Sequence, residues 1–355
     1  MSSPARTDLP FRRGRTDYVG FRAVIKAVGT GPRGSRALTF DEARDATAGL
    51  IAGDVSPVQA GAFLIAMRIK GEAPAELAGM AQALRDAAGC AATSPPDPPS
   101  GGRPVVACAG AFDGMNDAPH LSLAAAVLAA AAGARVVVHC GGPIGPKRGT
   151  TPADVLVALG GPLRPAPVES LAMLERSDVA LVHAGAAIPG WDALAAIRDE
   201  IGLRGPLHTA EKLVDHLGAT RFVVGHTHSS YRERILGALA LLGAQRAVAV
   251  RGMEGADVLR PARPSAADAG GPLDIPEMPG SVLRGDADPQ VAAELTRAIA
   301  AGEEHGSAGH AAILSAGVRL YVAGCCESVG AGAALATAAV QDGRATATLE
   351  ALLAA

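Results

Sequence analysis

The chain has 355 residues and a formal net charge of −3, so it is long enough for two compact domains and is not built as a whole to coat nucleic acid. Hydrophobic residues make up 49% of it and aromatic residues only 3%, so its core must rest on closely packed Ala, Val and Leu. No segment has the 18 or so uninterrupted apolar residues of a membrane span, and the N-terminus lacks a signal-peptide core. The five cysteines show no C-x-x-C spacing, so we expect a cytoplasmic protein with reduced thiols.

The N-terminal part of the chain divides into an expected tail and an expected helical domain. We expect residues 1–16 to form a flexible tail. The arginines of this tail could form either a solvated end or a phosphate-binding arm. Helical periodicity dominates residues 17–92, where Ser56 and Pro57 are typical of a helix start and Gly71 of a helix end. The expected helices are Tyr18–Val28, Thr39–Ala52, Ser56–Ile69 and Ala73–Ala88.

Residues 93–103 are rich in proline and glycine, which predicts a linker. The sequence pattern changes after them. Over residues 104–355, short apolar strands alternate with alanine-rich helices, which indicates an α/β domain with a mainly parallel sheet. Residues 265–285 predict an irregular segment or a short edge hairpin, and helices near 165–178 could complete the helical domain. The expected strands are Pro104–Ala109, Ala134–His139, Ala180–His183, Thr220–Val224 and Ala247–Val250. The expected helices are Ser122–Ala132, Thr151–Leu159, Trp191–Ile201, Arg232–Leu242, Gln290–Ala300, Ala308–Val322 and Gly330–Asp342.

The first expected strand of this domain runs into a loop that carries Gly110, Asp113 and Gly114 and leads to a helix at Ser122. Such loops expose backbone N–H groups, which can hold phosphate at a helix N-terminus. A plain strand-to-helix turn is the open alternative.

The second strand ends at His139, and the loop after it carries Lys147 and Arg148. The next helix has a clear start, because Thr151 is a typical N-cap residue and is followed by a proline. The two cations could bind phosphate, whereas a satisfied histidine and a solvated loop tip are the alternative interpretations.

Two later segments carry further candidates. Arg198 could grip a carboxylate with two parallel hydrogen bonds, or could simply cap its helix or pair with a surface acid. His226 and His228 lie on one face at strand spacing, and local hydrogen bonding is favoured there over a metal because no third ligand is obvious.

Together these strings resemble the anthranilate phosphoribosyltransferase family over nearly the whole chain. The run from Gly53 to Glu72, with Phe40–Ala43 before it and Pro74–Met80 after it, resembles the family's helical N-terminal domain. The resemblance implies a small helical domain joined to a larger α/β domain, and a homodimer formed through the helical part. It also implies transfer of a phosphoribosyl group from phosphoribosyl diphosphate to a small aromatic or nitrogenous acceptor.

The resemblance assigns roles to single residues. It implies that Asp257 and Glu254 bind Mg²⁺, although Val258 stands where the family has a second adjacent carboxylate. It also implies a glycine-rich diphosphate loop, which Ala109, Ala111 and Phe112 interrupt in this chain. We expect Val258→Glu to restore the pair at little cost in stability, because the position follows a strand exit. Arg198 and His208 are implied for the acceptor. The residues implied for the diphosphate are Gly110, Asp113, Gly114, Ser122, His139, Lys147 and Arg148.

A second function remains open. Residues 208–213 and 226–234 look more like a divergent branch of this family in which nucleic-acid binding is thought to have replaced transfer. That resemblance implies a non-catalytic dimer with a basic groove, which the arginine-rich start and Val258 favour and the net charge opposes.

Overall fold

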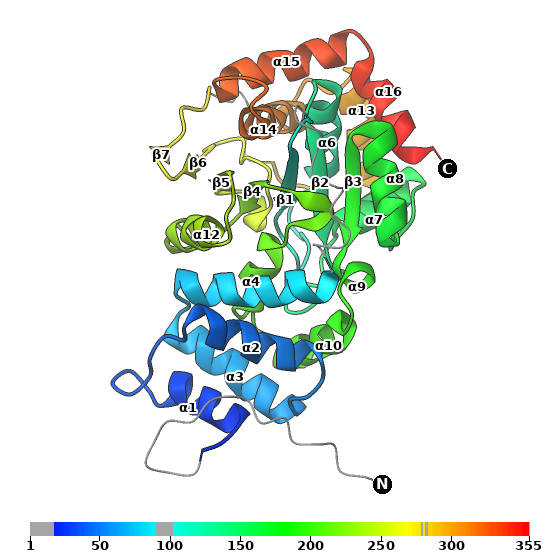
Figure 1. Ribbon diagram of the computed structural model, residues 1–355. Coiled ribbons are helices and arrows are strands. Elements are labelled where there is room, and N and C mark those ends of the chain that lie inside the picture. The colour runs from blue at the N-terminus through cyan, green and yellow to red at the C-terminus, as the bar shows by residue number, and fades with distance from the viewer. Residues whose placement is uncertain (1–17, 90–101, 278–279, 281–282, 355) are drawn as a thin grey trace.

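The computed structural model describes residues 18–89, 102–277, 280 and 283–354 (Figure 1). The expected tail at 1–16, most of its arginines and nearly all of the expected linker at 93–103 lie outside the described residues. Among the helices that the structure describes, none is both long and apolar enough to cross a membrane.

The N-terminal helices form a bundle, as the periodicity predicted. The Ser56 side chain accepts a hydrogen bond from the Gln59 N–H, and Pro57 occupies the first helical position. Phe21 and Phe63 pack edge to face at 5.3 Å between ring centroids, which joins the first helix to the third. The helices are α1 (Phe21–Gly29), α2 (Phe40–Ile51), α3 (Pro57–Lys70) and α4 (Pro74–Ala88).

The larger part of the chain forms a seven-stranded sheet in the order β3-β2-β1-β4-β5-β6-β7. The first five strands in this order are parallel and mostly buried, as in sheets that are covered on both faces. The last two pair antiparallel and form the edge hairpin that residues 265–285 allowed. The strands are β1 (Val105–Ala109), β2 (Arg135–Cys140), β3 (Val179–His183), β4 (Arg221–Gly225), β5 (Arg246–Val250), β6 (Ala266–Asp268) and β7 (Gly271–Pro272).

Helices cover the sheet and confirm the α/β class. All ten residues of α6 are buried, between β2 and the C-terminal helices that Figure 1 shows in orange and red. The helices after the bundle are α6 (Ser122–Ala131), α7 (Pro152–Leu159), α8 (Pro167–Ser177), α9 (Ala184–Ala187), α10 (Trp191–Ile201), α11 (Leu207–Ala210), α12 (Ser230–Leu241), α13 (Pro289–Ala301), α14 (Ser307–Ala323), α15 (Val329–Gln341) and α16 (Arg344–Leu353).

The helices that extend the bundle are not those suggested by the sequence. The helix α8, within the suggested 165–178, packs on β3 and α16 in the α/β domain. The helices α10 and α11 contact the bundle instead, through α2, α3 and α4. These contacts bring the loops that precede and follow α10 to the boundary between the two domains.

One helix, α4, joins the two domains by packing on both α2 and α12. Its Arg85 is buried and donates hydrogen bonds to the backbone carbonyls of Leu213 and Leu242. Arg85 also pairs with Asp215 at 3.2 Å. The guanidinium therefore ties the bundle to two separate segments of the α/β domain.

Candidate functional site

A cleft of about 560 Å³ lies between the helical bundle and the carboxyl ends of the parallel strands. Ligands of open α/β sheets bind at this edge, and the volume falls within the range of small-molecule sites. Polar and charged groups line it from α3, from the loops after β2 and β4, and from the segment after α10. They are Arg68, Lys147, Arg204, His208, Thr209, Lys212, His226, Thr227, His228 and Tyr231.

Four cations line the cleft, namely Arg68, Lys147, Arg204 and Lys212, and two of them are paired with acids, Lys147 with Glu254 and Arg204 with Asp113. Arg68 reaches across from α3 and donates a hydrogen bond to the backbone carbonyl of Arg204. Lys212 donates to the carbonyl of Gly225 at 3.0 Å, and burial lowers the pKa of its ammonium group to about 8. Lys147 completes the set from the loop after β2. A phosphorylated ligand would find several donors in a partly desolvated place.

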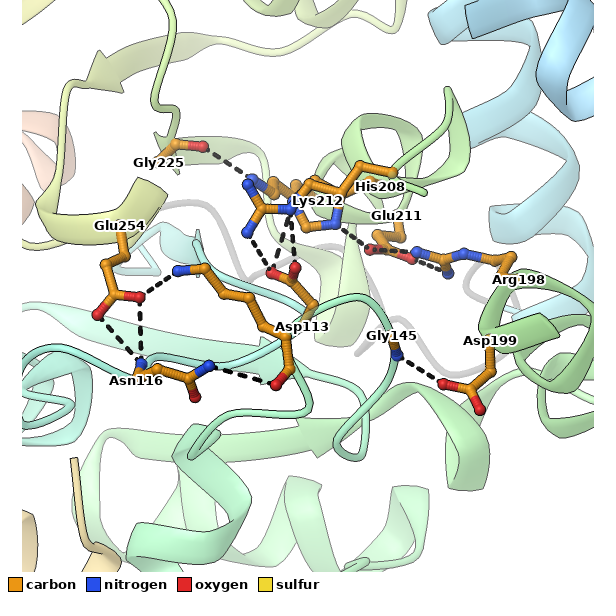
Figure 2. A network of polar contacts seen from close by, with 12 residues as sticks. Asp113, Asn116, Gly145, Arg198, Asp199, His208, Glu211, Lys212, Gly225 and Glu254 are labelled. Carbon is orange, nitrogen blue, oxygen red and sulfur yellow. Dashed lines mark hydrogen bonds and ion pairs between the residues drawn. The ribbon is translucent and has the colours of Figure 1, made fainter. Parts of the chain in front are cut away.

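The candidate Asp113 is fully buried and belongs to a network beside the cleft (Figure 2). Its two carboxylate oxygens accept hydrogen bonds from Arg204, at 2.7 and 2.9 Å. The ring of His208 lies between acids, with Nε2 4.0 Å from Asp113 and Nδ1 3.6 Å from Glu211. Burial and the neighbouring cations hold the pKa of His208 well below its usual value, so the imidazole is neutral.

Arg198, the candidate for an acceptor carboxylate, is already paired. Its guanidinium donates to both carboxylate oxygens of Glu211, at 2.5 and 3.2 Å, and both side chains are buried. The same group lies over the ring of Trp191 at 5.4 Å. The prediction that Arg198 is functional stays untested, and the structure gives its charge an internal partner.

The loop proposed for diphosphate is closed by packing. A side chain at Gly110 would come within 2.4 Å of the backbone nitrogen of Asp257, so this glycine permits the approach of another loop. Gly114 has φ +82° and lies against the backbone of Gly149 in the same way. Phe112 is buried and packs on the imidazole of His139 at 5.6 Å. The loop is therefore packed against neighbouring backbone at Gly110 and Gly114, and its role in binding diphosphate stays a prediction.

His139 is buried at the end of β2, between Phe112 and His216. Burial, together with the adjacent His216 and Lys212, holds its pKa well below the usual value for histidine. The ring is packed between two other rings, but neither of its nitrogens has a hydrogen-bond partner among the described residues, so His139 is not the satisfied histidine of the alternative interpretation. Its role as a phosphate ligand stays a prediction.

Lys147 and Glu254 form an ion pair at the edge of the cleft. Glu254 also accepts a hydrogen bond from the backbone N–H of Asn116 at 3.1 Å (Figure 2). A further one comes from the backbone N–H of Asp117 at 2.8 Å. Burial favours the neutral acid, but Lys147 and these donors outweigh it and lower the pKa of Glu254. Glu254 therefore acts as a carboxylate that holds the loop after β1.

The neighbouring Arg148 points elsewhere, because it pairs with Asp199 on α10. The same Asp199 accepts the backbone N–H of Gly145 at 2.8 Å (Figure 2). Arg148 lines a second cavity of about 490 Å³, together with Trp191 and His183, and does not line the cleft. The structure thus separates two adjacent cations that the sequence placed in one site.

The residues expected to hold Mg²⁺ do not fit that ion. The buried carboxylate of Asp257 accepts a hydrogen bond from Arg319 at 2.5 Å and another from Ser122. Glu254 is engaged by Lys147, and Val258 is fully buried. Within the described residues, no group of three or more His, Cys, Asp or Glu is placed to hold a metal. Mg²⁺ binds through free oxygen ligands, which these acids lack.

His226 and His228 are joined by a local hydrogen bond, which is the arrangement that the sequence favoured. The Nδ1 of His226 lies 3.1 Å from the backbone oxygen of His228 and donates to it. Burial lowers the pKa of His226 to about 4, so the ring that faces the cleft is neutral.

The interpretation of the sequence gave no role to two buried charged residues of this region, Glu211 and Arg319, and considered Lys212 only within residues 208–213. Arg319 had the clearest signal, because it is a lone charge in the apolar helical run Ile313–Ala323. A charge in such a run needs a buried partner, and here the partner is Asp257.

Two glycosyl transferase family models match the chain. The first, described as the helical bundle domain, matches residues 22–88, and the second, the a/b domain, matches residues 113–269. The chain therefore has both domains of a glycosyl transferase.

Named relatives identify the family more closely. Anthranilate phosphoribosyltransferase from Methylobacterium sp. is 32% identical over 350 residues, which covers 94% of this chain and 98% of the relative. The crystal structure of the Thermus thermophilus enzyme superimposes with a TM-score of 0.78 at 30% identity, covering 94% and 98%. The Saccharomyces cerevisiae enzyme, solved in complex with PRPP and Mg, superimposes at 0.76 with 16% identity, covering 94% and 96%, and supports the fold alone. The chain belongs to the anthranilate phosphoribosyltransferase family.

Proposed function

We propose that this chain binds a phosphorylated ligand, phosphoribosyl diphosphate or a related compound, in the cleft and transfers its sugar phosphate to a small nitrogenous acceptor. The observation that carries the proposal is the set of four cations, Arg68, Lys147, Arg204 and Lys212, which face one cleft at the carboxyl ends of the strands. The names of the relatives support the reaction class.

The chemistry that these residues can supply is electrostatic. In such a transfer the acceptor nitrogen bonds to the sugar carbon, the carbon–oxygen bond to diphosphate breaks, and the acceptor loses a proton. Charge builds up on the departing diphosphate, and fixed cations stabilise it without reorganisation. We assign this role to Lys147, Arg204 and Lys212, and derive no step through Mg²⁺ because Asp257 and Glu254 are otherwise engaged.

We further propose His208 as a residue that contacts the bound ligand. Its neutral ring lines the cleft next to Arg204 and Lys212, where it can accept or donate one hydrogen bond. Arg198 would act through Glu211 and His208, as a positioning residue.

The proposal predicts that Lys147→Met weakens pyrophosphate binding about tenfold, because the variant loses one charge-assisted contact. Isothermal titration with pyrophosphate and with phosphoribosyl diphosphate measures this. The matched control is Arg148→Met, which removes the adjacent positive charge on the far side of the loop and should leave both affinities unchanged. Equal loss in the two variants would show a diffuse charge effect and count against the cleft.

Nucleic acid is the competing occupant of the cleft. The non-catalytic alternative predicts that single-stranded DNA binds and that its affinity falls steeply between a low and a high salt concentration. It also predicts that neither phosphate ligand gives heat in the titration. Binding of the phosphate ligands alone would favour the transferase.

The pH dependence of anion binding gives a further prediction. The pKa of Lys212 is about 8 in the folded protein, so its positive charge is present below pH 8 and is lost as pH rises through this value. We expect sulfate affinity to fall up to about tenfold between pH 7 and pH 9, while the charge of sulfate stays constant. His226, with a pKa of about 4, does not titrate in this range. A Lys212→Met variant should give a flat profile, and a flat wild-type profile would remove Lys212 from the site.

The assembly and location are also proposed. Val58 and Ile69 on α3 are 82% and 80% exposed, which supports a homodimer through the helical domain. Light scattering would test this, and a monomer at all concentrations would contradict it. Among the described residues, Cys108, Cys140, Cys325 and Cys326 are free thiols, which supports a reducing, cytoplasmic location.

A further inference from the structure

Arg319 is the most deeply buried arginine or lysine that the structure describes, with no solvent exposure. It projects from α14 and reaches Asp257, whose Oδ2 accepts its hydrogen bond at 2.5 Å. A second guanidinium nitrogen donates to the backbone carbonyl of Ser315, at 2.9 Å. A backbone carbonyl of α14, the helix that carries Arg319, therefore holds the guanidinium in place.

The remaining oxygen of Asp257 is also engaged. Ser122, the first residue of α6, donates its hydroxyl hydrogen to Oδ1. The backbone around Asp257 is held as well, because the N–H of Leu259 donates to the Ser315 hydroxyl at 2.9 Å. Asp257 is 2% exposed, so neither of its oxygens is available to an incoming ion.

A potential cation ligand lies beside this cluster and is not used. His120 is 1% exposed, and neither of its ring nitrogens has a hydrogen-bond partner among the described residues. It lies with Asp257 and Gly110 around a small hollow that has no room for a water molecule.

We propose that Arg319 serves as a permanent internal cation for Asp257, so that the native chain holds no divalent metal at this carboxylate and keeps Asp257 as a latent metal ligand. This proposal concerns the metal alone and does not rest on the proposed function. A divalent cation would have to lose its water, enter a hollow too small for a water molecule and displace a tethered guanidinium. Removal of the guanidinium would leave a buried carboxylate without a counter-charge, which a cation could then supply.

The test compares melting temperatures with and without 10 mM Mg²⁺ or Mn²⁺. The wild type and Arg319→Lys, which keeps the charge, should show no shift with either metal. Arg319→Met should melt lower than both and should regain about 2 °C or more with Mn²⁺, because the ion binds the folded state alone. In Arg319→Met with Asp257→Asn, the buried charge is gone and the metal should again have no effect.

Metal stabilisation of the wild type equal to that of Arg319→Met would overturn the proposal, as would a folded Arg319→Met that no divalent cation stabilises. The wild type gives an independent measurement if Arg319→Met does not fold. Titration of Mn²⁺ into it should show no binding with a dissociation constant below about 1 mM, and tighter binding would overturn the proposal. Neither measurement uses a phosphate ligand, so failure of the proposed function cannot be mistaken for failure of this one.

Discussion

Replacing Glu211 with alanine is expected to lower the free energy of unfolding by about 3 to 5 kcal/mol, because it leaves the buried guanidinium of Arg198 without its partner. Both side chains are almost completely shielded from water, with side-chain exposures of 8% for Arg198 and 0% for Glu211. Urea unfolding followed by circular dichroism measures the change.

A double variant separates the ion pair from the packing. Arg198→Met with Glu211→Leu replaces both charges by apolar groups and should recover most of the lost stability, since buried pairs are often replaceable in this way. It should also weaken ligand binding, because His208 loses the carboxylate that lies 3.6 Å from its Nδ1. A double variant as unstable as Glu211→Ala would show that the site depends on shape and not on charge.

Val258→Glu is expected to destabilise the protein severely, contrary to the expectation drawn from the sequence. Val258 has no solvent exposure and belongs to the hydrophobic core, so a carboxylate there would lose its water without gaining a partner. We expect a loss of about 4 kcal/mol or more, or failure to fold, and no gain in Mg²⁺ affinity.

The control for this position is Val258→Ala, which removes volume without adding charge. It should cost less than the glutamate, and thermal unfolding of the two variants side by side shows the difference. A stable Val258→Glu protein that binds Mg²⁺ would restore the paired-carboxylate interpretation and would contradict the packing described around Asp257.

The fold could be predicted from the sequence because its signals are local. The start of α3 at Ser56 and Pro57 and the apolar run of β2 each depend on a few adjacent residues. The position of α8 could not be predicted, because its amphipathic pattern shows that one face is buried but not against which domain. Its contacts with β3 and α16 come from chain topology.

The site was predicted less well, and the reason is the pairing of charges over long distances in the chain. Lys147 and Glu254 are 107 positions apart, and Asp257 and Arg319 are 62 apart. Resemblance placed Asp257 and Arg198 in a ligand site, but no local pattern reveals that a distant residue neutralises each of them. Lys147 and Arg148 are adjacent, yet their partners lie on different segments and draw them apart.

The junction made by Arg85 has a consequence for how this protein can tolerate change. The carbonyls that its guanidinium holds belong to the main chain at Leu213 and Leu242, and every amino acid supplies the same oxygen there. Substitutions of those two side chains therefore leave the junction's acceptors in place, whereas loss of the one arginine removes its donors together. On the side of the α/β domain, the ion pair with Asp215 depends on the identity of a side chain, whereas these hydrogen bonds to main-chain oxygens do not.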